Sequence, residues 1–282
     1  MAQENTDLAV TGATGALGGM VARLLAEAGI PQRLLARHTA KLAPMNNTPV
    51  FATAYSDHDH SVRALRGVRT LFMVSAAESP YRRQDQRTFV DSAAEAGVEH
   101  IVYTSFMNAR PDAVFTLARD HWDTEEYIKS KGLKYTFLRD CLYQDILPGF
   151  VGRDGVIRGP AGHGIVAAVA RPDVARSAVR ILTDPGEHEG AVYTLTGPQA
   201  LSLDEVAAVL TEVTGKPVSY HNETLGEALE SRRGMGAEQW QVEAWTSTYV
   251  AIAAGEMSKV SPDVERLTGT PPLAFADYLL QG

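Results

Sequence analysis

Short apolar runs alternate with amphipathic stretches along the first half of the chain. The runs are rich in Val, Leu, Ile and Phe and too short for buried helices, so they predict strands. These strands are expected at residues 7–10, 32–37, 49–53, 69–74, 100–104 and 134–139. The stretches between them predict helices, the clearest at residues 20–28, 58–65, 83–96 and 112–131. This alternation predicts an α/β fold with a doubly wound parallel sheet.

The alternation ends after residue 139. Residues 152–164 are rich in glycine, and Ser202 followed by Glu205 is a capping-box pattern that predicts the start of a helix. Further helices are expected at residues 173–183 and between residues 224 and 255, and further strands at residues 193–196 and 217–221. We therefore expect two domains, residues 1–140 and residues 141–282, the second being a smaller α/β lobe partly interleaved with the first. The substrate is expected between them.

A glycine-rich turn, VTGATGALGG at residues 10–19, joins the first strand to the first helix. Gly12 suits a tight turn, Gly15 admits a pyrophosphate close to the main chain, and Gly18 lets the helix pack against the strand. The amides and dipole at the start of the helix favour an anion. An ordinary turn can look similar, but the position between strand and helix favours a dinucleotide site. The expected cofactor contacts in this turn are Gly12, Thr14, Gly15, Ala16, Leu17 and Gly18.

The residues after the second strand indicate which dinucleotide binds. Arg37 and Lys41 lie there, and no Asp or Glu occurs between Glu27 and Asp57. A carboxylate near this strand binds the ribose 2′-hydroxyl of NAD, whereas a cation suits the 2′-phosphate of NADP. NADP(H) is therefore favoured, and NAD(H) stays open as a second choice. Lys41 equally suits a helix start that faces solvent.

Ligands of doubly wound sheets bind at the carboxyl ends of the strands. At or after the later strand ends lie Ser75, Ala76, Thr104, Ser105, Phe106, Met107, Asn108, Asp140 and Tyr143. We expect Ser75, Ala76 and Thr104 to contact the cofactor. The expected substrate contacts are Phe106, Met107, Asn108 and Tyr143.

The composition narrows the class of protein. The chain has 282 residues, is 45% hydrophobic and carries a formal net charge of -8, which argues against a nucleic-acid partner. Its one cysteine, Cys141, rules out an internal disulfide and suits a reducing compartment. Residues 1–5 lack the basic start of a signal peptide, and no apolar run has the length of a membrane span. We expect a cytoplasmic monomer or homodimer with no membrane partner and no metal.

Several motifs together resemble the NmrA-like branch of the atypical short-chain dehydrogenases/reductases. They are TGATGALG at residues 11–18, HWDTE at 121–125, GLKYTFLR at 132–139, RPDVA at 171–175 and YTLTG at 193–197. Through FLRDCLY at residues 137–143, the chain is most similar to the bacterial quinone oxidoreductases and triphenylmethane reductases of this branch. The resemblance implies an NADP(H)-binding Rossmann domain, a small C-terminal lobe and an aromatic or quinonoid substrate.

The chain departs from the short-chain dehydrogenase pattern at positions that carry chemistry. Typical members have a Tyr and a Lys four residues apart, where this chain has Leu117 and His121. An Asp that often holds the adenine is replaced by Ala54, which Tyr55 follows, and Asp140 stands where relatives often have Asn. The usual proton donor is therefore absent.

The loss of the Tyr changes which acceptors are reasonable. A ketone needs a positioned acid, whereas hydride addition to a quinone gives a delocalised anion and addition to a triarylmethyl cation needs no proton. The catalytic candidates are His121, Ser105, Tyr143 and Asp140. His121 is expected to hold the nicotinamide ribose or relay a proton, with an ordinary helix-face histidine as the alternative. Tyr143 equally suits packing between the lobes, and Asp140 a turn.

These residues favour an NADPH-dependent reductase of a quinone or another planar conjugated aromatic, including a polyketide-type quinone. The alternative is a non-catalytic NmrA-like regulator that senses the dinucleotide and signals through a partner. Ser105 and the similarity over residues 140–143 favour the enzyme, and the missing Tyr and Lys favour the sensor.

Overall fold

A seven-stranded parallel sheet with the strand order β3-β2-β1-β4-β5-β6-β9 organises the first part of the chain. The computed structural model describes residues 6–42 and 48–281, so residues 1–5, on which the signal-peptide argument rests, lie outside it. The strands are β1 (Leu8–Val10), β2 (Arg33–Ala36), β3 (Val50–Ala52), β4 (Thr70–Met73), β5 (His100–Phe106), β6 (Lys134–Asp140) and β9 (Val192–Leu195). The order reverses between β1 and β4, which is where doubly wound sheets bind ligands.

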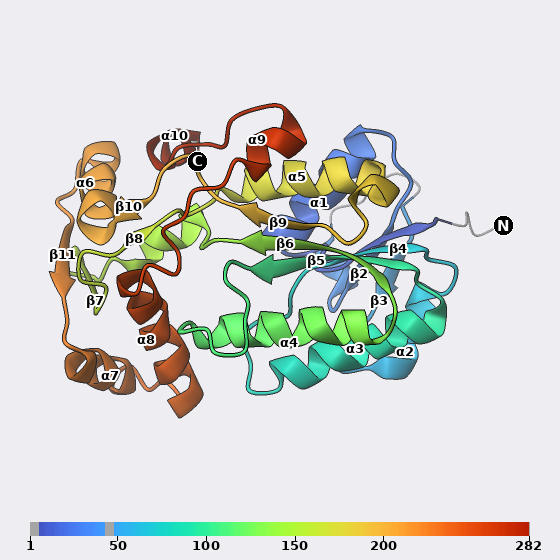
Figure 1. Cartoon of the computed structure of the whole chain (residues 1–282), viewed down its shortest axis with the longest axis horizontal. Helices are drawn as coiled ribbons and strands as arrows, with labels where there is room; N and C mark the ends of the chain where they lie inside the picture. Colours follow the sequence, from blue (N-terminus) through green and yellow to red (C-terminus); the bar gives the residue numbers. More distant parts are fainter. Residues whose placement is uncertain (1–5, 43–47, 282) are drawn as a thin grey trace. The chain divides into compact units, whose positions relative to one another are not determined.

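Helices cover both faces of this sheet, α1 and α5 on one and α2, α3 and α4 on the other (Figure 1). Their bounds are α1 (Ala16–Glu27), α2 (His58–Leu65), α3 (Arg82–Ala96), α4 (Thr116–Ser130) and α5 (Arg171–Thr183), with short 3₁₀ turns η1 (Thr39–Lys41), η2 (Gln144–Phe150) and η3 (Pro185–His188). The expected doubly wound Rossmann-type sheet is confirmed.

The rest of the chain forms two small sheets and five helices among the described residues. Strand β7 (Val156–Gly159) pairs in parallel with β11 (Ser219–Asn222), and β8 (Ile165–Val166) pairs antiparallel with β10 (Leu201–Ser202). The helices are α6 (Leu203–Thr214), α7 (Leu225–Gly234), α8 (Gln239–Ala253), α9 (Asp263–Thr268) and α10 (Phe275–Gln281). The expected capping box starts α6, since the Ser202 side chain accepts from the Glu205 amide and Glu205 accepts in return.

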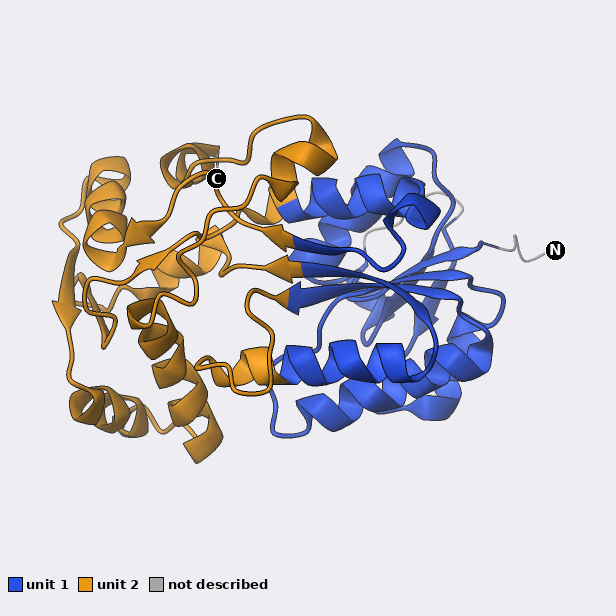
Figure 2. Ribbon diagram, viewed as in Figure 1, with its two compact units in different colours: residues 1–105, 120–138, 174–193 blue, residues 106–119, 139–173, 194–282 orange. Residues whose placement is uncertain are grey.

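The chain divides into two compact units (Figure 2). Unit 1 comprises residues 1–105, 120–138 and 174–193, and unit 2 comprises residues 106–119, 139–173 and 194–282. The expected division after residue 140 lies near one observed boundary, at which the chain passes from unit 1 to unit 2 after Leu138. The other boundaries arise because residues 106–119 belong to unit 2 and residues 174–193 to unit 1. Each unit has its own buried core, around Phe89, Tyr103 and Phe137 in unit 1 and around Leu142, Ile252 and Phe275 in unit 2.

Three expected boundaries differ from the structure at places that concern the site. Helix α1 begins at Ala16, directly after the glycine turn, instead of at residue 20. Strand β5 continues to Phe106 instead of ending at residue 104, and α4 begins at Thr116 instead of residue 112. Between these two elements, Asn108 adopts a φ of 57°. This left-handed conformation is compatible with neither a strand nor an α-helix. Residues 107–115 therefore form a loop that follows β5 directly. No described helix is long and apolar enough to cross a membrane.

Candidate dinucleotide and acceptor site

The turn between β1 and α1 has the geometry that its glycines predict. Gly12 has a φ of 62°, and Gly15 stands at the N-cap of α1, where it has no side chain to occupy the first amides of the helix. A Cβ on Gly18 would lie 2.4 Å from the carbonyl oxygen of Gly12 and 2.5 Å from that of Thr11. Helix and turn thus meet at a distance that only glycine permits, with amides of the first helical turn open to an anion.

A closed set of hydrogen bonds fixes this turn to the neighbouring strands. The Val74 amide donates to Thr11 Oγ1 (2.8 Å), and the Tyr55 hydroxyl donates to the Val74 carbonyl oxygen (2.5 Å). The hydroxyls of Thr11 and Tyr55 lie 2.6 Å apart, and the Tyr55 ring stacks on Phe89 at 4.1 Å. Tyr55, which follows the position of the missing adenine-binding Asp, thus ties β1 and β4 together beside the glycine turn.

Two cations follow β2 as the sequence indicates. Arg37 and Lys41 are both exposed, Arg37 directly after β2 and Lys41 at the end of η1. Burial raises the pKa of the Tyr55 hydroxyl, and the positive charge of Arg37 opposes this rise. Arg37 therefore acts electrostatically on the side chain beside the glycine turn.

The predicted cofactor residues after β4 and β5 are connected to one another. The Ser75 amide donates to Thr104 Oγ1 (2.8 Å), and the Ala76 amide donates to Gln86 Oε1 (3.1 Å). Arg82 Nε donates to the Ala76 carbonyl oxygen (2.9 Å). The segment after β4 is thus held by β5 and by the first turns of α3.

His121 is buried within a directed chain of hydrogen bonds in unit 1. Arg82 lies 2.9 Å from His121 Nε2, and since a guanidinium only donates, Nε2 accepts. His121 Nδ1 lies 3.0 Å from the Tyr103 hydroxyl, which itself donates to Gln86 Oε1 (3.0 Å), so Nδ1 carries the proton. Burial, followed by the charge of Arg82, lowers the pKa of His121 well below its usual range. The imidazole is neutral, and both its nitrogens have protein partners.

The Ser105 side chain is hydrogen-bonded to a buried carboxyl group, that of Glu125. Its hydroxyl donates to Glu125 Oε1 at 2.5 Å, and both residues are buried. A ligand that approaches Ser105 would meet a hydroxyl whose proton is directed at Glu125. Ser105 therefore offers a ligand its oxygen lone pairs.

The expected substrate residues after β5 belong to unit 2. Phe106 and Met107 are buried in its core, where the rings of Phe106 and Phe115 lie 4.8 Å apart. Asn108 is exposed, and its side chain donates to the Glu256 carbonyl oxygen. Leu117, at the position of the usual Tyr, packs against the same core.

Asp140 and Tyr143 form a hydroxyl–carboxyl pair after β6. The Tyr143 hydroxyl donates to Asp140 Oδ2 at 2.7 Å, and Asp140 Oδ1 is buried with no hydrogen-bond partner among the described residues. Burial raises the pKa of Asp140 to about 8, and the Tyr143 hydrogen bond opposes the rise. The Arg171 guanidinium lies 4.5 Å from the centre of the Tyr143 ring and pairs with Asp145. The pair therefore presents a protonated carboxyl linked to a phenol at neutral pH.

Sequence reasoning did not identify the residues that support these candidates. Arg82 and Gln86 are four apart on one face of α3, and Glu125 is four residues after His121 on α4. A spacing of four indicates that two side chains share a helix face, so these pairs could have been found in the sequence. The contact of Tyr103 with His121 has no such sequence signal, because it depends on how α4 packs on β5.

The comparisons with known proteins agree with this geometry. The NmrA-like family model matches residues 4–249. The (4-alkanoyl-5-oxo-2,5-dihydrofuran-3-yl)methyl phosphate reductase of Streptomyces griseus is 36% identical over 95% of both chains. The structure of the NADPH-dependent quinone oxidoreductase QOR2 of Escherichia coli, complexed with NADPH, has a TM-score of 0.87 and 31% identity, covering 97% of this chain and 99% of that one.

A second solved structure is similar over the same length. The triphenylmethane reductase of Citrobacter sp., complexed with NADP(H), has a TM-score of 0.85 and 31% identity, with coverage of 97% and 99%. The resemblance inferred from the motifs is thus confirmed in its family and in the relatives that it named. The chain belongs to the NmrA-like family.

Proposed function

We propose that this protein is an NADPH-dependent reductase that transfers hydride to a quinone or a similar planar conjugated acceptor. The observation that carries the proposal is the combination of an intact dinucleotide turn with the Asp140–Tyr143 pair, in a chain that has Leu117 in place of the usual Tyr. The relatives named above include reductases of quinones, of triphenylmethane dyes and of a conjugated furanone, so the acceptor class agrees with theirs.

The residues of unit 1 fit an NADP-type dinucleotide. The turn that begins at Gly12 has the left-handed backbone and the uncapped helix start that a pyrophosphate needs. Arg37 supplies the cation for a 2′-phosphate, and no carboxylate competes with it at the end of β2. Thr104 and the segment after β4 are held in place by hydrogen bonds and would line the nicotinamide end. NADPH, when bound, supplies the hydride.

Reduction of a quinone requires one hydride and one further proton. The hydride carries two electrons and reduces one carbonyl system, which leaves a phenolate-like oxygen. We assign the proton to Tyr143, whose hydroxyl would turn from Asp140 and pass its hydrogen to that oxygen. The protonated Asp140 carboxyl would then donate its proton to the Tyr143 oxygen, in the reverse direction of the present hydrogen bond, and would take a new proton from water. The delocalised anion of a quinone needs less help than a ketone alkoxide, which suits a site with a single hydroxyl donor.

His121 and Ser105 take positioning roles in this proposal. His121 is neutral and bonded on both nitrogens, so it would hold the nicotinamide side of the site through Arg82 and Tyr103 without relaying a proton. Ser105 fixes the end of β5 through Glu125 and can accept a hydrogen bond from the carboxamide of a nicotinamide. The regulatory alternative is less favoured, since a sensor needs no hydroxyl–carboxyl pair beside the sheet.

The test uses the full chain and two dinucleotides. Fluorescence titration should give tighter binding of NADPH than of NADH, and a naphthoquinone or anthraquinone added to the NADPH complex should cause oxidation of NADPH. Binding of NADPH without turnover across a panel of quinones, azo dyes and triphenylmethane dyes would refute the reductase and support the sensor.

A further inference from the structure

The loop after β5 is organised by one distant carboxylate, Glu256. The Val114 amide donates to both of its carboxylate oxygens, at 3.0 Å to Oε2 and 3.3 Å to Oε1, and the Arg110 guanidinium pairs with the same group. The side chain of Asn108 donates to the Glu256 backbone oxygen. Glu256 therefore engages the loop near its start, at its middle and near its end.

The conformation of this loop depends on these contacts. Residues 107–115 form no regular secondary structure, and Asn108 adopts a left-handed backbone that carries a conformational cost for a residue other than glycine. The Glu256 side chain is only 10% exposed, so its carboxylate needs the donors that the loop supplies. A further hydrogen bond joins α8 to the residue after the loop, since the Ser247 hydroxyl accepts from the Thr116 amide at 3.1 Å.

The loop carries the side chains that follow the reacting edge of the sheet. Phe106 ends β5 and Met107 begins the loop, Phe115 packs on Phe106, and Leu117 follows in the first turn of α4. Ligands of such sheets bind beyond the carboxyl ends of the strands, and β5 ends at Phe106. Phe106 and Phe115 are buried, whereas Val114 and Leu117 are only partly buried. A shift of this loop would therefore move the apolar surface that Val114 and Leu117 present to a flat acceptor.

We propose that Glu256 is a positioning residue for the acceptor: it holds the loop of residues 107–115 in the shape that receives a planar ring, while the dinucleotide residues of unit 1 do not depend on it. This inference rests on the proposed reductase function. Glu256 follows the end of α8 and is far from β5 in the sequence, and in this proposal it contributes to the choice of acceptor.

The test compares three variants with the wild type in the NADP⁺-loaded protein. Glu256→Ala removes all acceptors of the side chain, Glu256→Gln keeps one carbonyl oxygen for the Val114 amide, and Glu243→Ala removes an exposed glutamate of α8 as a control. Binding of 2-methyl-1,4-naphthoquinone is measured by fluorescence quenching, NADPH binding by titration, and folding by thermal unfolding.

We expect the Kd of the quinone and its KM to rise about tenfold or more in Glu256→Ala, in line with the loss of a hydrogen-bonded charge. Glu256→Gln should recover much of this loss, and Glu243→Ala should behave as the wild type. The Kd of NADPH should stay unchanged in all three. An unchanged quinone Kd in Glu256→Ala, or an equal loss of NADPH binding, would overturn the proposal.

The direct binding measurement separates this proposal from the proposed function. A wild-type protein that binds the quinone without turnover would refute the reductase and leave the role of Glu256 to be decided by the variant's Kd. A wild-type protein that binds NADPH but no quinone would refute both the acceptor class and the role assigned to Glu256.

Discussion

The hydroxyl of Tyr143 donates a 2.7 Å hydrogen bond to a carboxyl group, that of Asp140, which burial keeps protonated at neutral pH. Because the two residues are three positions apart in the sequence, the pair is a local feature of the turn after β6. Its two members can be tested separately, one through stability and one through turnover.

Asp140 should make stability depend on pH. Its pKa is about 8 in the folded chain and about 4 in the unfolded chain, so between these values the folded state binds the extra proton. The free energy of unfolding should therefore fall as the pH rises through this range, with a slope of at most about 1.4 kcal/mol per pH unit from this group.

Asp140→Asn removes this group and is the matched comparison. Urea unfolding of both proteins is measured at several pH values from about 5 to 8. The free energy of unfolding of the variant, relative to that of the wild type, should increase as the pH rises. A stability difference that stays constant over this range would show that Asp140 is not protonated in the folded chain.

Tyr143→Phe should lower the turnover of quinones by about 10²-fold, the typical contribution of a positioned acid, with the Kd of NADPH unchanged. Tyr127→Phe is the control, because the Tyr127 hydroxyl also donates to a carboxylate, that of Asp91, at 3.0 Å. Steady-state kinetics with one quinone decide the matter. Equal activity of the two variants would remove Tyr143 from the reaction.

Arg37→Asp should weaken NADPH binding much more than NADH binding, because the substituted carboxylate repels a 2′-phosphate and suits a 2′-hydroxyl. Arg63→Asp, a change of an exposed arginine on α2, should alter neither. Fluorescence titration with both dinucleotides measures the ratio. A parallel loss of the two affinities would place Arg37 away from the 2′-position.

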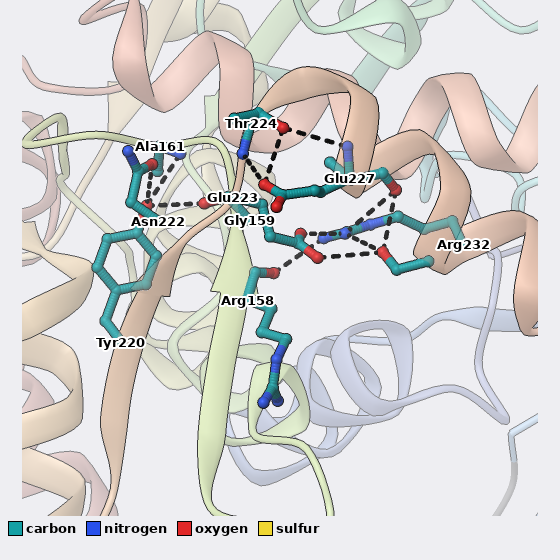
Figure 3. Close-up of polar contacts among 11 residues, drawn as sticks. Arg158, Gly159, Ala161, Tyr220, Asn222, Glu223, Thr224, Glu227 and Arg232 are labelled. Carbon is teal, nitrogen blue, oxygen red and sulfur yellow. Dashed lines mark hydrogen bonds and ion pairs between the residues drawn. The ribbon is translucent and has the colours of Figure 1, made fainter.

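The buried pair of Glu223 and Arg232 should control the stability of unit 2 (Figure 3). Arg232 also donates to the Arg158 carbonyl oxygen at 2.9 Å and lies over the Tyr249 ring. Arg232→Met leaves the Glu223 carboxylate buried without its cation, at a cost of about 3–5 kcal/mol. Denaturant unfolding should show this loss.

Two further variants define the origin of that loss. Adding Glu223→Gln to Arg232→Met removes the buried charge and should recover part of the stability. Arg233→Met, which changes the exposed neighbour, should have little effect. If the double variant is no more stable than Arg232→Met alone, the loss comes from packing on Tyr249.

The strands, the helices of the sheet and the glycine turn were predictable because their signals are local. The period of apolar residues identifies β1 to β6, and the positions of Gly12, Gly15 and Gly18 specify the turn. The Ser202 capping box is equally local. Each of these features depends on residues within a few positions of one another.

The start of α4 and the surroundings of His121 were not predictable in the same way. Residues 112–115 have no local feature that prevents a helix, and the loop shape depends on Glu256, 142 positions after Val114. The neutrality of His121 depends on Arg82, which is 39 positions away. Such contacts follow from packing, and a single sequence gives no periodic signal for them.

The contact between Arg82 and His121 limits how this chain could return to the usual Tyr and Lys pair. A lysine at position 121 would place a second positive charge beside a buried guanidinium, which already pairs with Asp120 at 3.5 Å. The reversion would therefore require a change at position 82 as well as at positions 117 and 121. Positions 82 and 121 are thus coupled by direct contact, so the effects of substitutions at these two positions should not add.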